Sequence, residues 1–152
     1  MNPNILPFIA TLSDGNPDSS GANIYGVWTK LDGSRDSSLL MAKAKLAPLQ
    51  NEGETLEQEL AGAAKAARLK CWVLKHTGLK FLKFLHFLDS QIVQDMIRND
   101  SYGFRASAGL RVADIQQKTN VDKWFHIKSA ENVADILTRA KLKDIISFGI
   151  FD

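Results

Sequence analysis

Residues 81–88, Phe-Leu-Lys-Phe-Leu-His-Phe-Leu, form an apolar run with one charged residue, and this run decides the fold. A run of this length and composition predicts a β-strand that lies in the centre of a sheet. An Ala-rich helix is predicted before it, over about residues 55–75, and Gly78 lies just beyond the helix end. A helix that precedes a buried strand is typical of a crossover, so we expect strand 81–88 to join its sheet in parallel.

Three strands are expected upstream of that helix, over residues 5–12, 24–31 and about 38–46. Residues 13–23, Ser-Asp-Gly-Asn-Pro-Asp-Ser-Ser-Gly-Ala-Asn, consist of turn-forming residue types and predict a loop between the first two strands. Asp32-Gly33 predicts a hairpin turn between the second and third strands. These connections indicate an antiparallel meander.

Downstream of residue 88 we expect a short helix after Ser90, a helix over about 104–118, a strand over 124–127 and a last helix over about 132–140. A meander followed by crossover units predicts an α/β fold with a five-stranded mixed sheet and helices on both faces, which is the order of the ribonuclease H fold. We expect the 152 residues to form one domain. Its core would span about 5–140, and 141–152 would be a C-terminal tail or short helix.

The composition limits the classes of function. The net charge of +2 is too small to indicate nucleic-acid binding by itself. Cys71 is the one cysteine, which excludes an internal disulfide and favours a reducing, intracellular compartment. We expect no signal peptide, and the apolar runs are too short or too interrupted by charges to span a membrane.

Four carboxylates lie where a charge has little structural reason to be: Asp14, Glu59, Asp89 and Asp135. Asp14 and Asp89 stand at the carboxyl ends of the first and fourth expected strands, where ligand sites of such sheets lie. Asp135 falls in the first turn of the last expected helix.

The helical phase of residues 55–75 makes Glu59 informative. Leu56, Leu60 and Ala63 fall on the same arc as Glu59, whereas Lys65 falls on the opposite side. We therefore expect Glu59 to point towards the core, where an unpaired carboxylate costs several kcal/mol.

Each acid also has a structural alternative. Asp14 could form an Asx turn, and Asp89 could be the N-cap of the helix that follows it. Asp135 stands three residues after Asn132, as in a capping box. Glu59 could be an edge residue or could contact a helix cap at Thr55.

Four converging carboxylates repel one another, and a fold retains such a cluster mainly when divalent metal neutralises it. Carboxylates are hard oxygen ligands that suit Mg²⁺ or Mn²⁺. Two such ions would hold a phosphodiester between them, activate the attacking water and stabilise the leaving oxygen. The sequence therefore predicts phosphodiester hydrolysis with two metal ions.

The sequence resembles the ribonuclease H segment of Pao/BEL-type retrotransposon polyproteins. The resemblance covers most of residues 5–140. Five segments carry it in order: Ala42-Lys-Ala-Lys-Leu-Ala-Pro-Leu49, Glu59-Leu-Ala-Gly-Ala-Ala-Lys-Ala-Ala-Arg-Leu69, Asp89-Ser-Gln-Ile-Val93, Arg111-Val-Ala-Asp-Ile-Gln116, and Trp124-Phe-His-Ile127 with Glu131-Asn-Val-Ala-Asp-Ile-Leu-Thr-Arg139.

The resemblance implies an endonuclease that hydrolyses the RNA strand of RNA–DNA hybrids during reverse transcription of a retroelement. It implies Asp14, Glu59, Asp89 and Asp135 as the metal-binding catalytic residues, with Glu57 as the alternative to Glu59. The implied partners are the hybrid and a reverse transcriptase domain of a parent polyprotein. The implied location is a retroelement particle in the cytoplasm, and no membrane association is expected. Five residues are expected to contact the hybrid: Gly15, Asn16, Lys43, Ser90 and Arg139.

Two other functions compete with this one. A catalytically silent ribonuclease H-like module could serve nucleic-acid binding or scaffolding, although such modules often lose acids that this chain keeps. An integrase or transposase core usually has the order Asp, Asp, Glu, whereas here the Glu comes second.

Overall fold

A computed structural model describes residues 4–47, 55–99 and 106–127. Its sheet has the strand order β3-β2-β1-β4-β5. β1 pairs antiparallel with β2, and β2 with β3, whereas β1 pairs in parallel with β4, and β4 with β5. The expected meander and parallel crossovers are confirmed, and so is the ribonuclease H-like fold class. The strands are β1 Phe8–Asn16, β2 Ser19–Thr29, β3 Arg35–Leu46, β4 Phe84–Leu88 and β5 Trp124–His126.

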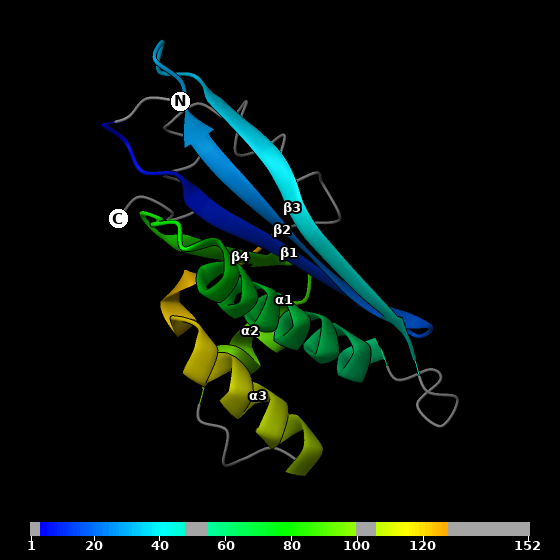
Figure 1. Ribbon diagram of the computed structural model, residues 1–152. Helices are drawn as coiled ribbons and strands as arrows, with labels where there is room; N and C mark the ends of the chain where they lie inside the picture. Colours follow the sequence, from blue (N-terminus) through cyan, green and yellow to red (C-terminus); the bar gives the residue numbers. More distant parts are fainter. Residues whose placement is uncertain (1–3, 48–54, 100–105, 128–152) are drawn as a thin grey trace.

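The described helices all pack on one face of this sheet (Figure 1). They are α1 Thr55–Thr77, α2 Gln91–Arg98 and α3 Ala106–Lys118, with the 3-10 turn η3 Val121–Lys123 before β5. The helix expected over 132–140 lies outside the described residues. None of the helices of the described chain has the length and apolar character needed to cross a membrane.

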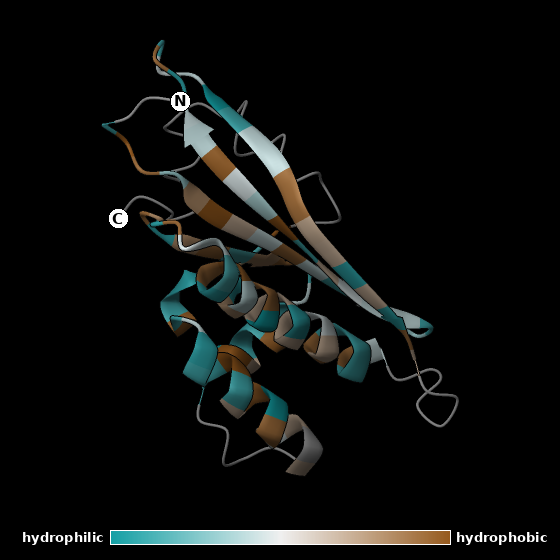
Figure 2. Ribbon diagram, viewed as in Figure 1, coloured by the Kyte–Doolittle hydropathy of each residue, from teal (hydrophilic) through white to brown (hydrophobic). Residues whose placement is uncertain are grey.

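Two hydrophobic clusters lie on opposite faces of the sheet. The larger cluster joins strand residues such as Ile9 and Trp124 to the apolar sides of the helices. The smaller one consists of strand residues and Ile127, and Phe87 is among its buried members. Hydrophobic and hydrophilic stretches follow one another along the strands (Figure 2).

The first hairpin is longer than the sequence predicted. β1 begins at Phe8 and continues through Asp14 to Asn16, and Ile5 and Leu6 are exposed rather than part of the strand. The loop predicted over 13–23 is wrong, because its residues pair in register from Ser13 opposite Ala22 to Asn16 opposite Ser19. Small polar side chains fit a strand here because alternate positions, including Ser13 and Ser20, are buried under a helix.

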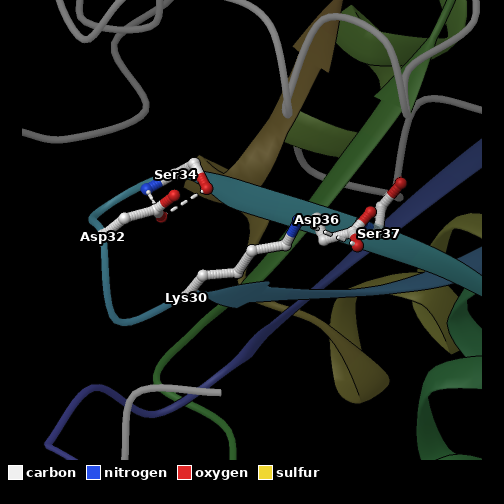
Figure 3. Close-up of polar contacts among 5 residues, drawn as sticks. All are labelled: Lys30, Asp32, Ser34, Asp36 and Ser37. Atoms are coloured by element: carbon white, nitrogen blue, oxygen red, sulfur yellow. Dashed lines mark hydrogen bonds and ion pairs between the residues drawn. The ribbon is translucent and has the colours of Figure 1, made fainter.

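The second hairpin turn is the one that Asp32-Gly33 predicted. Gly33 has φ of 87°, which favours glycine, and Asp32 Oδ1 accepts hydrogen bonds from Ser34 N at 2.9 Å and Ser34 Oγ at 2.6 Å (Figure 3). These two bonds hold the pKa of Asp32 below its usual value. Lys30 and Asp36 form an ion pair of 3.6 Å across the base of the turn (Figure 3).

Helix α1 is buried over a wider arc than its sequence indicated, because it packs against β1 and β2 on one side and α3 on another. Gln58 and Lys65 are buried, although Lys65 was expected to face solvent. Leu56 is 42% exposed, although it was expected to lie on the core arc. Glu59 is half-buried at the border of this arc.

Two large apolar side chains of the helices are exposed. Trp72 of α1 is 45% exposed and stacks on His76, with the ring centroids 4.4 Å apart. In α3, Leu110 is 74% exposed, whereas Ile115 is fully buried.

Candidate active site

Asp14 of β1 lies next to Asp89, which directly follows the parallel neighbour strand β4. β1 and β4 are paired up to Ser13 and Leu88, and the two aspartates are the next residues of each chain segment. Both aspartates line one hollow with a volume of about 450 Å³. We call it the acidic hollow, and it is lined by residues 12–14, 21–23 and 42–44, Asp89 and Ile127.

The two aspartates influence each other electrostatically. Partial burial raises the pKa of the Asp89 carboxyl, and the neighbouring Asp14 carboxylate raises it further. A hydrogen bond from the backbone of Asp89 and the nearby His126 oppose this shift. The Asp14 carboxylate therefore disfavours ionisation of Asp89 in the acidic hollow.

The structure gives the helix-capping role to Ser90 and not to Asp89. Ser90 is the N-cap of α2, and its Oγ accepts a hydrogen bond from Val93 N at 3.2 Å. A capping role was the main structural alternative for Asp89, and the neighbouring serine already performs it. The Asp89 carboxylate is thus left to face the acidic hollow.

Asp14 is likewise not the residue that forms the hairpin turn. Asn16 Oδ1 accepts from Asp18 N at 2.8 Å and from Ser19 N at 2.9 Å, which closes the turn between β1 and β2. The Asp14 side chain accepts from the adjacent Gly15 N at 2.8 Å. The Asx-turn alternative therefore applies to Asn16.

Two glycines bring the start of α1 against the end of β1. A Cβ atom added at Gly15 would lie 2.2 Å from the Glu59 backbone nitrogen, and one added at Gly62 would lie 2.5 Å from the Asp14 carbonyl oxygen. Backbones approach this closely only where side chains are absent. The contact places the Glu59 backbone beside Gly15, the residue that follows Asp14, although the two are far apart in the sequence.

Three of the four expected carboxylates fall in the described chain, and Asp135 lies outside it. Within residues 4–47, 55–99 and 106–127, no three His, Cys, Asp or Glu side chains form a group that could hold a metal ion. The donors of the acidic hollow nevertheless suit a divalent cation, because Asp14 and Asp89 are hard oxygen ligands whose mutual repulsion a cation would relieve.

A comparison with protein families identifies the chain. Residues 6–90 match the family model described as the Pao retrotransposon-like RNaseH-like domain. The chain belongs to this family. The matched segment of the RNaseH-like domain contains Asp14, Glu59 and Asp89, and it ends just after the acidic hollow's second aspartate.

Solved structures similar to this RNaseH-like domain are RNase H domains. RNase H1 from Halobacterium salinarum is 16% identical, with a TM-score of 0.48, and 90% of this chain and 98% of that one are covered. An N-terminal RNase H domain from Mycobacterium tuberculosis is 13% identical, with a TM-score of 0.49 and coverage of 93% and 97%. LC11-RNase H1, in a complex with RNA/DNA hybrid, is 15% identical, with a TM-score of 0.47 and coverage of 92% and 99%. No curated protein sequence matches the chain.

The residues expected to contact nucleic acid have different positions in the RNaseH-like domain. Lys43 is exposed and lines the acidic hollow, whereas Gly15 packs against α1. Asn16 closes the first hairpin, and Ser90 caps α2. Arg139 lies outside the described residues.

Sequence reasoning did not assign His126 to the site, but the structure places it there. His126 pairs with Leu88 in the parallel register of β4 and β5. Its Nε2 donates a hydrogen bond to the Asp89 carbonyl oxygen at 3.0 Å. The ring therefore fixes the backbone that carries Asp89. The signal that could have found it is its position two residues after the buried Trp124 of the last strand.

Proposed function

We propose that this RNaseH-like domain is a metal-dependent nuclease that hydrolyses the RNA strand of RNA–DNA hybrids during reverse transcription of a retroelement. Asp14, Glu59, Asp89 and Asp135 would hold the Mg²⁺ or Mn²⁺ ions. The observation that carries the proposal is the pair of repelling carboxylates, Asp14 and Asp89, on adjacent strands in one hollow. Membership of the family, shown by the match over residues 6–90, supports the retroelement context.

The chain's own groups have separable roles in this reaction. Asp14 supplies an anionic oxygen from β1, and Asp89 supplies one directly after the end of β4. Glu59 comes from α1, whose place beside β1 is fixed by Gly15 and Gly62. His126 holds the Asp89 backbone and is a positioning residue. When bound, divalent ions would supply activation of water and stabilisation of the leaving oxygen.

Nucleic-acid contacts and partners belong to the same proposal. Lys43 is the described cation at the acidic hollow, and it would contact the substrate backbone together with Gly15, Asn16, Ser90 and Arg139. A net charge of +2 offers limited attraction for a polyanion. We therefore expect a reverse transcriptase domain of the parent polyprotein to supply part of the affinity.

The test is cleavage of a labelled RNA–DNA hybrid in Mg²⁺ or Mn²⁺ by the wild type, by Asp89→Asn and by Asp14→Asn. Asp122→Asn is the matched control, since it removes the same charge from an exposed turn. We expect both site variants to lose at least about 100-fold in rate and the control to keep full activity. Equal cleavage by all four proteins would refute the site assignment. Binding by the wild type without cleavage would favour a silent scaffold module.

A further inference from the structure

Two polar side chains meet inside the sheet, on the face that the helices cover. Thr11 of β1 and His86 of β4 are fully buried, and Thr11 Oγ1 lies 2.7 Å from His86 Nδ1, which is hydrogen-bond distance. The two residues are direct partners in the parallel register of β1 and β4. Thr11 shares its face of the sheet with Ile9 of the larger cluster, because side chains two positions apart on a strand point the same way. A side-chain hydrogen bond therefore joins the two strands that lead to Asp14 and Asp89.

Trp124 of β5 extends this pair into a row across three strands. It is the partner of His86 in the parallel register of β4 and β5, and the two rings stack with their centroids 4.6 Å apart. Trp124 is also fully buried, and its Nε1 donates a hydrogen bond to Thr119 Oγ1 at 2.8 Å. We call Thr11, His86 and Trp124 the transverse row. Its members occupy neighbouring positions on three adjacent strands.

The ring of His86 suits this buried position because it is neutral. Burial, and to a smaller extent Lys70, lower the pKa of His86 to about 3. A neutral imidazole has one N–H and one bare nitrogen, so Nδ1 can bond to the Thr11 hydroxyl in either tautomer. In the part of the chain that the structure describes, His86 Nε2 has no hydrogen-bond partner. The hydrogen bond to Thr11 is thus the one that the ring makes there.

The transverse row stands at equal offsets from the two aspartates. Asp14 follows Thr11 by three residues, and Asp89 follows His86 by three residues. β1 and β4 run in the same direction, and they stay paired over the two residues that follow the row in each strand. The register at the row therefore decides which residues lie side by side where the pairing ends. In the observed register, these residues are the two aspartates.

Apolar packing alone would leave this register weakly determined. Most residues that β1 and β4 pair are apolar, and a slip of two residues would keep every side chain on its own face of the sheet. Such a slip would set Thr11 opposite Phe84 or Leu88, where no polar side chain could bond to its hydroxyl. In one direction His86 would instead meet Ser13, whose buried Oγ has no partner among the described residues, but Thr11 would stay unpaired. Because a buried polar group without a hydrogen bond is costly, the Thr11–His86 pair selects the observed register.

We propose that Thr11 and His86 are positioning residues, and that their hydrogen bond holds β1 and β4 in the register that brings the two aspartates of the acidic hollow together. Three residues separate Thr11 from Asp14, so the two side chains point to opposite faces of the sheet. The pair therefore acts through the strands and not by contact with the carboxylates. A single buried polar residue can fix the register of packed elements in this way. The inference rests on the proposed function for the use of the two carboxylates as ligands of Mg²⁺ or Mn²⁺.

The test uses three variants of the row and a matched control. Thr11→Val removes the hydroxyl and keeps the shape of the side chain, whereas Thr11→Ser keeps the hydroxyl. Thr11→Val with His86→Leu removes both polar groups, so neither partner is left buried without the other. Thr119→Val is the control, because Thr119 is also buried and its hydroxyl bonds to Ile115 O and Trp124 Nε1, outside the β1–β4 pair.

Two measurements report on the position of the aspartates without cleavage. One is amide hydrogen exchange in EDTA over residues 87–89, and the other is titration with Mg²⁺ alone, followed by the NMR shifts of Asp14 and Asp89. We expect exchange in Thr11→Val to be about five-fold faster than in Thr119→Val, because the strands open locally. We expect Thr11→Val to bind Mg²⁺ about ten-fold more weakly than the wild type, and Thr11→Ser to restore most of this loss. Thr119→Val should bind Mg²⁺ like the wild type.

The double variant separates positioning from stability. Replacement of both partners by apolar groups leaves neither one unpaired, so its Tm should return towards that of the wild type, whereas its Mg²⁺ affinity should stay low. Recovery of the Mg²⁺ affinity together with the Tm would overturn the proposal. So would a Thr11→Val variant that matches Thr119→Val in both exchange and Mg²⁺ affinity.

Cleavage of the hybrid distinguishes this inference from the proposed function. Faster exchange in Thr11→Val, with a wild type that neither binds Mg²⁺ nor cleaves hybrid, upholds the register role and refutes the proposed function. Cleavage and Mg²⁺ binding that are normal in Thr11→Val and in the double variant refute the inference alone.

Discussion

At the scale of single residues, the acidic hollow depends on the neighbours of its two aspartates, which cap a helix and close a turn in their place. Ser90 caps α2 and Asn16 closes the first turn, so Asp89 and Asp14 are free of both roles. Each aspartate is thus followed, within two residues, by a residue that stabilises the local backbone. This division allows the carboxylates to repel each other without loss of the strand ends that carry them.

Asp89→Asn should stabilise the metal-free protein. The pKa of Asp89 is raised in the folded state, so the folded state disfavours the ionised carboxylate. The free energy of unfolding therefore falls as pH rises above 3.8, the ordinary pKa of an aspartate, until the carboxyl is ionised in the folded state. Near neutral pH the variant should gain about 2 °C in Tm, and the gain should vanish below that interval. Thermal unfolding in EDTA from acid to neutral pH measures this. Mg²⁺ should raise the Tm of the wild type more than that of the variant, and a lower Tm for Asp89→Asn in EDTA would contradict the repulsion.

At the scale of elements, the position of α1 on β1 builds the site. Gly15 and Gly62 allow backbone contact between the helix and the strand, and this contact sets where Glu59 lies along β1. The sequence predicted both elements and placed Glu59 on the helix. The sequence did not reveal how closely α1 approaches β1. A sequence does not show whether the space that a Cβ would occupy at a glycine is open or already filled by neighbouring atoms.

Gly15→Ala and Gly62→Ala should each destabilise the domain by about 3 kcal/mol, because the added Cβ would overlap backbone atoms that cannot rotate away. Gly26→Ala is the control, since its Cβ would lie 3.4 Å from the flexible end of Leu40, and its effect should stay within about 0.5 kcal/mol. Urea unfolding of the three variants gives the comparison. If Gly15→Ala lowered the free energy of unfolding as little as Gly26→Ala does, α1 would be able to shift away from β1.

Ser90→Ala should lower the stability of the domain by about 1 kcal/mol, because Val93 N would lose its hydrogen-bond partner at the start of α2. Ser90→Asn, which can also cap a helix, should restore most of this loss. Urea unfolding and the helical circular dichroism signal of the two variants test the assignment. If Asp89→Asn lost stability in the same way and Ser90→Ala did not, the cap would belong to Asp89.

At the scale of the whole molecule, the sheet order and the fold class followed from the sequence, because long apolar runs and turn residues carry strong signals. The boundaries near Ser13 and the burial of Lys65 did not follow, because both depend on what packs above them. Polar residues enter a strand when a helix covers them, and a lysine is buried when three elements surround it. The sequence placed Asp14 and Asp89 near the carboxyl ends of β1 and β4, but it gave no sign of the hydrogen bond between His126 and the Asp89 backbone.

Acid should unfold the molecule partly through His86. This histidine is fully buried, its Nδ1 lies 2.7 Å from Thr11 Oγ1, and its pKa is lowered to about 3, mainly by burial and further by Lys70. A lowered histidine pKa contributes stability above 6.5 that is lost as pH falls from there towards 3. His86→Gln should flatten the stability profile in this interval by up to about 1.4 kcal/mol per pH unit. The exposed His76→Gln is the control, and equal slopes for both variants would contradict the role of His86.

The alternation along β3 has a consequence for insertions and deletions. Tyr25 pairs with Leu39 and Ile24 with Met41, so Leu40 is an extra residue that β3 accommodates as a bulge. Loss of Leu40 would leave Met41 opposite Ile24 and make the ladder regular. Lys43 and Lys45 would then keep their face of the sheet, and Ala42 and Ala44 would keep the opposite one. The strand can therefore lose one codon at the bulge without any change in which face of β3 carries the charge.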